Sequence, residues 1–228
     1  CSGTNIPYGP KCQLALIGAD SKIDISNMAI QTDKGNISYT GKFDYNSLNT
    51  QGMLLSWDEA IAGSEVNADN YISGAWNAGT VDGSQWGVPA TMGSWTMYVN
   101  TDLAEKYVPG CLDDGFITYA EMEAAGEAAK ADGNYAVAST WSMQNYMNIY
   151  QQMGGTWLDA DGKISVNNEQ SIASIEEYKK FKDNGWLVPQ GEDAGKLFLN
   201  GKLIFLPEGT WMLSTMQTIT DFAWVETF

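Results

Sequence analysis

Short strand-like runs alternate with helical segments from residue 51 onward, and this alternation limits the fold more than any other feature of the sequence. The run Trp95-Thr96-Met97-Tyr98-Val99 carries the β-branched and aromatic residues typical of a strand. Thr118 and Glu121 form a capping box that opens an alanine-rich helix, and Leu203–Leu206 is a continuous apolar strand. Strands that alternate with helices of ten or more residues predict an α/β fold with a largely parallel sheet.

Two more helices are expected from the spacing of apolar residues. One covers Ser142–Met153 and ends at a glycine pair. The other ends at Asn184-Gly185, and its apolar stripe consists of Ile172, Ile175, Tyr178 and Phe181. Between these helices, Asp159–Gly162 has a superficial likeness to a calcium loop. The acid expected at the end of such a loop is displaced, so we interpret the segment as a hairpin turn.

The side-chain inventory limits the chemistry as sharply as the pattern limits the fold. The chain has nine tryptophans and eleven tyrosines, no histidine, and only lysine among its twelve basic residues. Catalysis by Ser-His-Asp or Cys-His is therefore excluded, and there is no arginine to clamp a carboxylate or phosphate with two hydrogen bonds. Flat aromatic surface with short polar side chains suits a neutral, hydroxyl-rich ligand such as a sugar, although aromatic residues also build ordinary cores.

Charge and cysteine usage narrow the choice of partners. A net charge of −16 would repel nucleic acid and anionic lipid. Cys1-Ser2-Gly3 is what a bacterial lipoprotein shows after removal of its signal, but Cys1 could equally be an ordinary cysteine. Cys12 and Cys111 could form a disulfide, which sequence alone does not show. Without histidine or a CxxC motif, we expect no metal site and no cofactor.

Six blocks of the sequence, in register, resemble a known family. Residues 51–223 are similar to the extracellular solute-binding proteins of carbohydrate ABC transporters, which include the maltodextrin-binding proteins. The blocks are Gln51–Leu55 ("xGLLxPL"), Asp82–Pro89 ("DGKxYGVP"), Tyr98–Leu103 ("YYNKDLF"), Thr118–Met122 ("TWDEF"), Gly154–Lys163 ("NGGxLLDxDGK") and Phe198–Trp211 ("FxxGKAAMxxxGPWxL").

The resemblance implies a fold of two α/β lobes joined by a hinge, with the ligand held between them. We expect a partial first lobe at 1–91, within which 1–50 match the family poorly. The second lobe is expected at 92–228, and it ends near the point where the family chain crosses back to the first lobe.

The resemblance also implies which residues contact the ligand. Met92, Gly93, Ser94 and Trp95 follow the GVP motif in a stretch that lines the cleft, although Trp95 could instead be strand core. Trp141 and Gln144 begin a helix whose N-terminal end faces the cleft. Trp211 aligns with the tryptophan of "GPW", and Glu208 could accept hydroxyl protons or cap the turn. Four other tryptophans are expected in the core: Trp76, Trp157, Trp186 and Trp224.

The implied function is that of a non-catalytic, monomeric lipoprotein that captures a neutral sugar or oligosaccharide. Such a protein delivers its ligand to the permease of an ABC transporter and lies outside the cell, anchored by lipid at Cys1 or free in the periplasm. One alternative is a glycoside hydrolase, which would need two facing acids, and no acid pair with that signature is found. The other alternative is a surface adhesin for carbohydrate.

Overall fold

A computed structural model divides the chain into two compact units, Cys1–Ser94 (unit 1) and Trp95–Phe228 (unit 2). The structure describes residues 11–15, 17–18, 22–24, 29–32, 35–38, 54–139 and 142–227. Side chains are described within 54–90, 93–139 and 146–227.

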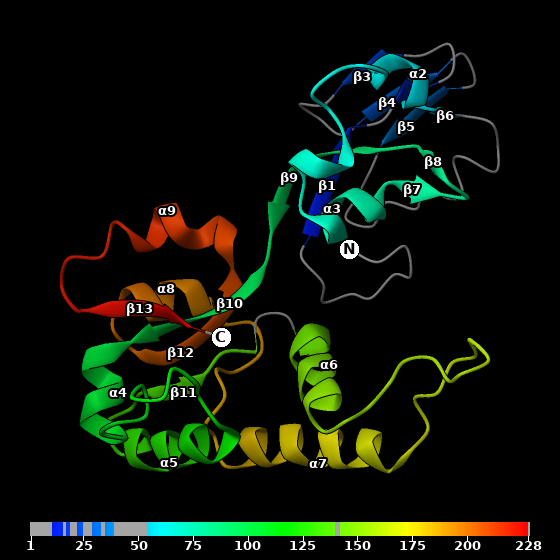
Figure 1. Cartoon of the computed structure of the whole chain (residues 1–228). Coiled ribbons are helices and arrows are strands. Elements are labelled where there is room, and N and C mark those ends of the chain that lie inside the picture. The colour runs from blue at the N-terminus through cyan, green and yellow to red at the C-terminus, as the bar shows by residue number, and fades with distance from the viewer. Residues whose placement is uncertain are drawn as a thin grey trace. The chain divides into compact units, whose positions relative to one another are not determined.

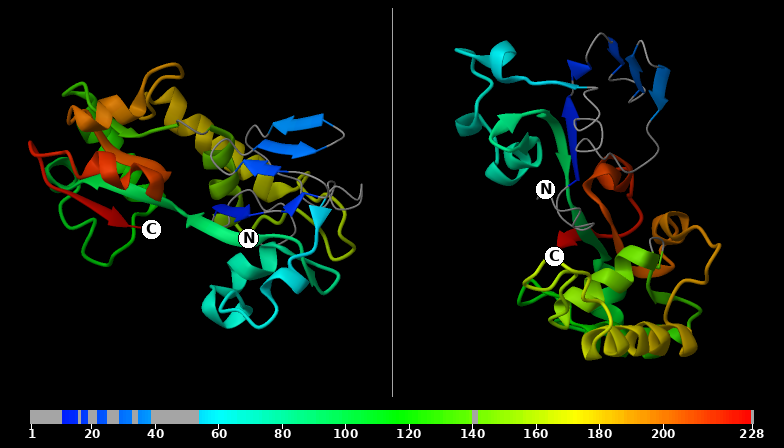
Figure 2. Two further views of the ribbon diagram at one scale, coloured as in Figure 1. Left: turned by 90° about the horizontal axis from the view of Figure 1, so that it is seen from above. Right: turned by 90° about the vertical axis from the view of Figure 1, so that its right-hand side faces the viewer.

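Unit 1 is built from short antiparallel strands and short helices. Its longest pairing joins β1 (Lys11–Ala15) to β9 (Val88–Gly93), with a register shift between Gln13 and Leu14, and the two strands lie side by side in Figure 2. The remaining elements are β2 (Ile17–Gly18), β3 (Lys22–Asp24), β4 (Ala29–Thr32), β5 (Gly35–Ser38), β6 (Leu54–Leu55), α2 (Asp58–Ile61), η1 (Ala68–Asn70), α3 (Ser73–Ala78), β7 (Thr80–Val81) and β8 (Ser84–Gln85).

The described part of the resemblance in unit 1 shows why the "DGKxYGVP" block has its residues. Asp82 and Gly83 both adopt positive φ, 50° and 84°, and connect β7 to β8 in a two-residue hairpin. A turn with positive φ at both central residues matches the twist of the paired strands, and Asp-Gly is a preferred sequence for it. The chain then enters β9, which leads toward unit 2.

Unit 2 consists of a four-stranded sheet with helices on both faces (Figure 1). Its elements are β10 (Trp95–Asn100), α4 (Thr101–Tyr107), α5 (Tyr119–Lys130), β11 (Tyr135–Val137), α6 (Ser142–Gln152), α7 (Glu169–Asp183), α8 (Ala194–Leu199), β12 (Leu203–Gly209), η2 (Thr210–Met212), α9 (Leu213–Met216) and β13 (Trp224–Thr227). The expected capping box at the start of α5 is present in full, because Thr118 and Glu121 each accept the backbone N–H of the other.

The expectation of a largely parallel sheet is wrong. The strand order in unit 2 is β11-β12-β10-β13, and β11–β12 is the only parallel pair among these four described strands. The parallel pair is joined by a long helical crossover, as strand–helix alternation predicts. In contrast, β10 enters the sheet directly from β9 and runs antiparallel to both of its neighbours, which the pattern of elements alone does not show.

Each face of this sheet carries its own apolar core. On one face, Val99 and Ile204 pack with Met122 of α5 and Phe181 of α7. On the other face, Tyr98 and Leu206 pack with Phe198 of α8 and Met216 of α9 (Figure 1). Leu203–Leu206 is fully buried, as expected for a central strand covered on both sides.

The apolar stripe predicted for α7 is only half buried, which corrects the sequence interpretation. Phe181 is buried and Tyr178 half-buried, but Ile172 and Ile175 are 58% and 54% exposed. The helix itself ends at Asn184, as expected. Apolar spacing fixes which side chains share a helix face, but it does not show how far the packed core extends along that face.

The cysteines resolve differently. Cys111 is a free thiol buried in the core of unit 2, and its burial raises the pKa of the thiol. Cys12 lies in β1 with its side chain outside the described residues, and Cys1 lies outside them altogether.

Candidate functional site

The antiparallel ladder between β10 and β12 brings three of the expected site residues together. Trp95 pairs with Gly209, and Thr96 pairs with Glu208 at the next step. The chain continues from Gly209 into η2, which carries Trp211. We refer to Trp95, Glu208, Gly209 and Trp211 as the aromatic corner. All four residues belong to unit 2.

The indole ring of Trp211 is held in place from two directions. A Cβ atom on Gly209 would lie 2.2 Å from the ring of Trp211, so the ring rests directly against the glycine backbone. The Nε1–H group of Trp211 donates to Oε2 of Glu208 over 3.1 Å. Even so, Trp211 is 43% exposed. Because one ring face lies on Gly209, the exposed area falls largely on the other face and on the ring edge.

Trp95 lies against the same ring. The ring centroids of Trp95 and Trp211 are 5.1 Å apart with an angle of 82° between the planes, an edge-to-face contact that is favourable for aromatic pairs. Trp95 is itself half-buried, so it belongs partly to the packing of the strand and partly to the corner. The two alternatives considered for it from sequence therefore describe the same residue.

Glu208 is a buried carboxylate with donors from its own chain. It is 7% exposed, and its Oε2 accepts both the Trp211 indole and the backbone N–H of Gly209, the latter at 3.0 Å. Burying a carboxylate is costly unless hydrogen bonds compensate it, and these two do so in part. Its negative charge also contributes, after burial and the charge of Glu226, to raising the pKa of Tyr98 to about 12.

Two residues of this region were not singled out from sequence. Gly209 admits the ring of Trp211, and the hydroxyl of Tyr98 donates to the carbonyl of Gly209 over 3.2 Å. The glycine stands between two residues that were chosen, Glu208 and Trp211, and a glycine at the end of a strand is a known sign of close approach. Nothing in the local sequence indicates the role of Tyr98.

The other expected contact residues are not brought to the corner by the described structure. Gly93 and Ser94 belong to unit 1, and the side chain of Met92 lies outside the described residues. Trp141 also lies outside them, while Gln144 lies in α6 without a described side chain. Of the four tryptophans expected in the core, Trp186 is buried, whereas the other three are half-buried: Trp76, Trp157 and Trp224.

The hairpin interpretation of Asp159–Gly162 is confirmed. Oδ1 of Asp159 accepts the backbone N–H groups of Asp161 and Lys163, and Leu158 and Ile164 form an antiparallel bridge. The carboxylate thus closes a turn. Across the described ranges there is no group of three or more cysteine, aspartate or glutamate side chains that could hold a metal ion.

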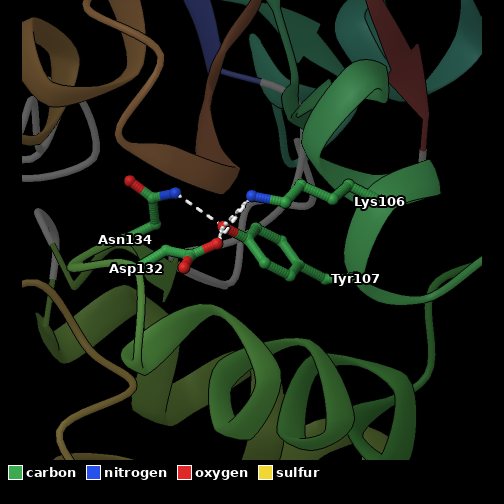
Figure 3. Close-up of polar contacts among 4 residues, drawn as sticks. All are labelled: Lys106, Tyr107, Asp132 and Asn134. Atoms are coloured by element: carbon green, nitrogen blue, oxygen red, sulfur yellow. Dashed lines mark hydrogen bonds and ion pairs between the residues drawn. The ribbon is translucent and has the colours of Figure 1, made fainter.

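A second polar cluster lies at the far end of α4 and is structural in character. Lys106 contacts Asp132 at 2.6 Å, and the Tyr107 hydroxyl donates to the same carboxylate while accepting from Asn134 (Figure 3). The Lys106 contact lowers the pKa of Asp132 and raises the pKa of Lys106. These bonds tie α4 to the turn after α5, and the charged pair is largely exposed, so its contribution to stability is small.

Within the described residues, no helix combines the length and the apolar composition needed to cross a membrane.

Solved structures share the fold at low sequence identity. The ABC substrate-binding protein Lmo0181 from Listeria monocytogenes, solved with cycloalternan, has a TM-score of 0.67 at 19% identity, covering 78% of this chain and 48% of its own. UgpB from Mycobacterium tuberculosis, solved with glycerophosphocholine, has 0.66 at 18%, covering 79% and 48%. The sugar-binding protein MalE from Xanthomonas citri has 0.57 at 21%, covering 75% and 45%.

These likenesses confirm the expected α/β fold of the two-lobed binding proteins, present here in part, because the chain spans about half the length of the structures that it matches. Comparison with curated protein sequences gives no match. The family model for bacterial extracellular solute-binding proteins matches residues 28–225, which is most of the chain. The chain therefore belongs to the bacterial extracellular solute-binding protein family.

Proposed function

We propose that the chain is the solute receptor of a sugar ABC transporter and that it binds a neutral sugar or oligosaccharide at the aromatic corner. The observation that carries this proposal is the ring of Trp211, which is fixed by Gly209 and Glu208 and yet 43% exposed. An exposed ring that is already held in one orientation loses little conformational freedom when a sugar ring stacks on it. Trp95 forms a wall at nearly a right angle to it.

The comparisons support a sugar as the ligand class. Among the solved structures of the same fold, Lmo0181 was solved with cycloalternan and the GacH receptor of Streptomyces glaucescens with acarbose. In the proposed arrangement, unit 1 belongs to the first lobe, expected at 1–91, and unit 2 to the second, expected at 92–228. Closure of the two lobes on the ligand would bring Met92, Gly93, Ser94, Trp141 and Gln144 to the same ligand as the corner.

The same proposal covers mode of action and place of work. The protein captures its ligand without catalysis and passes it to the permease subunits of the transporter. It acts as a monomer outside the cell, either held at the surface by lipid on Cys1 or in the periplasm. The name of the family, which is extracellular, supports this location.

A second ligand class is favoured by one specific observation. UgpB, which shares the fold, was solved with glycerophosphocholine. A buried carboxylate beside two indole rings, as in Glu208 with Trp95 and Trp211, also suits a quaternary ammonium group, which is attracted by aromatic faces. This candidate is weaker, because the chain has no arginine for the phosphate.

Calorimetry separates these candidates. The chain is titrated with maltotriose, with cycloalternan and with glycerophosphocholine, and each titration is repeated with Trp211→Ala and with Trp224→Ala as a matched control. Trp224 is a half-buried tryptophan of unit 2 that packs on Tyr98 rather than on the corner. Heat with a sugar that is lost in Trp211→Ala alone supports the proposal. Heat with glycerophosphocholine alone supports the second candidate, and release of reducing sugar would instead indicate a glycoside hydrolase.

A further inference from the structure

A cavity of about 140 Å³ lies inside unit 2, between the sheet and the helices α5, α6 and α7. Met97 and Pro207 form its floor on the sheet, and Met122, Ile149 and Phe181 form walls from the three helices. Met97 and Pro207 are paired in the ladder two positions beyond Trp95 and Gly209. The cavity therefore lies along the same strands as the aromatic corner but shares no lining residue with it.

The walls of the cavity are apolar with a few hydrogen-bonding groups. Four lining side chains carry such groups: Tyr119, Asn148, Gln152 and Tyr178. Among the hydrogen bonds found in the described part of the chain, none uses the side chain of Asn148 or Gln152. None of the lining residues is charged. Burial followed by the charge of Glu177 raises the pKa of Tyr119, so its hydroxyl remains a donor well into the alkaline range.

An apolar space of this size is destabilising when it is empty, and the loss grows with the volume. Water does not relieve it well, because an apolar cavity of about 150 Å³ in another protein stays dry and takes up benzene instead. Helix α6 closes the cavity through Ile149 and is itself fixed to α7, where the Tyr146 and Ser171 hydroxyls are 2.7 Å apart. The helix is therefore held over the space rather than packed into it.

We propose that this cavity is a second binding site, for a small uncharged molecule with an apolar body of about one aromatic ring and one hydrogen-bonding group. The apolar walls accept the ring, and the amides of Asn148 and Gln152 or the hydroxyls of Tyr119 and Tyr178 bond the polar group. The site is independent of the aromatic corner and of any sugar bound there, so this proposal and the proposed function stand or fall separately.

The test uses p-cresol as the probe and the methionine methyl groups of the chain as reporters in NMR titrations. Met97 and Met122 line the cavity, whereas Met216 is fully buried in the core on the opposite face of the sheet and serves as the control. We expect saturable shifts at the two lining methyls and none at Met216. Toluene, which lacks the hydroxyl, should bind several-fold more weakly. Shifts absent at the lining methyls, equal at Met216, or equally strong binding of toluene would overturn the proposal.

A filling substitution gives an independent measurement. Ile149→Trp places a larger side chain into the cavity, and Ile175→Trp makes the same change at an exposed position on α7 outside it. We expect p-cresol to bind Ile149→Trp at least about tenfold more weakly and Ile175→Trp as the unchanged chain does. Unchanged binding by a folded Ile149→Trp variant would contradict the site. If that variant does not fold, the comparison of p-cresol with toluene on the unchanged chain decides the matter.

Discussion

Two tryptophans of unit 2, Trp186 and Trp211, are placed by the same local construction. Each donates its indole N–H to a glutamate, Trp186 to Glu127 at 3.2 Å and Trp211 to Glu208 at 3.1 Å. Each lies against a glycine whose Cβ would collide with it, at 2.4 Å for Gly126 and 2.2 Å for Gly209. Each also meets a neighbouring aromatic ring nearly edge to face, at angles of 85° and 82°.

Burial is inverted between the two sites. In the core, Trp186 is 7% exposed and its partner Glu127 is exposed on α5, whereas in the corner the ring is exposed and Glu208 is buried. A buried ring contributes to folding by removing apolar area from water. A ring held in place but left open contributes little to folding, and its fixed orientation has value only if something binds to it. The difference identifies Trp211 as the better candidate for contact with a ligand.

The largest expected effect is on folding and separates the two rings directly. Trp186→Ala should lower the free energy of unfolding by about 3–5 kcal/mol, as truncations of buried aromatic residues do. Trp211→Ala should lower it by less than about 1 kcal/mol, because much of the ring is already in water. Urea denaturation of both variants measures the difference. An equal loss in the two would mean that Trp211 is a core residue and would break the comparison.

The two glycines provide the next test. Gly126→Ala would place a methyl group against Cβ, Cγ and Cδ1 of Trp186, the part of the side chain nearest its backbone, so the ring cannot turn away. We expect a loss of about 1–3 kcal/mol of stability, as for overpacked cores. Gly209→Ala meets only the outer atoms of the Trp211 ring, which is free to swing toward solvent. Its effect on unfolding should be smaller than that of Gly126→Ala, while ligand binding should weaken as the ring leaves its position. Greater destabilisation by Gly209→Ala would contradict this.

The comparison also shows where reasoning from the sequence succeeds and where it stops. The capping box at Thr118, the turn at Asp159 and the buried run Leu203–Leu206 are set by neighbours in sequence, and the structure confirms all three. Pairing between distant strands is different. That β10 runs antiparallel to β12, and that Trp95 therefore meets Gly209, depends on contacts between residues more than a hundred positions apart.

The candidate site shows the same limit. Sequence resemblance selected Trp95, Glu208 and Trp211, which the ladder does bring together. It did not select Gly209 or Tyr98, because the need for a glycine arises only once the ring of Trp211 is placed over it. Similarly, the spacing of Ile172 and Ile175 placed them on the same face as Phe181, but only three-dimensional packing decides that they are exposed.

Binding should respond in the opposite order to stability. Trp211→Ala should weaken sugar binding by about 1–3 kcal/mol, which corresponds to roughly fivefold to more than a hundredfold in Kd. Exposed Trp211 should thus matter for the ligand while buried Trp186 matters for the fold. Calorimetric titration of Trp211→Ala at a temperature where it is fully folded measures this. Normal affinity in that variant would remove Trp211 from the binding site even if the stability prediction held.

The smallest expected effect concerns the tyrosines that support the two regions. The Tyr98 hydroxyl donates to the carbonyl of Gly209 in the corner, whereas Tyr119 packs edge to face on Phe181 in the core, and none of the hydrogen bonds within the described residues involves its hydroxyl. At neutral pH, Tyr98→Phe should therefore cost about 0.5–1.5 kcal/mol of stability, the net contribution of one hydrogen bond, and Tyr119→Phe close to none. Urea denaturation of the two variants tests this. An equal cost would mean that the Tyr98 bond does not support Gly209.

Alkaline pH should reveal the same tyrosine by its titration. Burial, with the charges of Glu226 and Glu208, raises the pKa of Tyr98 from 10.0 to about 12. Because the folded pKa is above the unfolded one, the stability linked to Tyr98 is fully present below about pH 10 and is lost as pH rises toward pH 12. Tyr98→Phe should make this alkaline loss shallower. Ultraviolet absorbance of tyrosinate measures the titration directly, and ionisation of every tyrosine near pH 10 while the chain is folded would show that the corner does not bury Tyr98 as described.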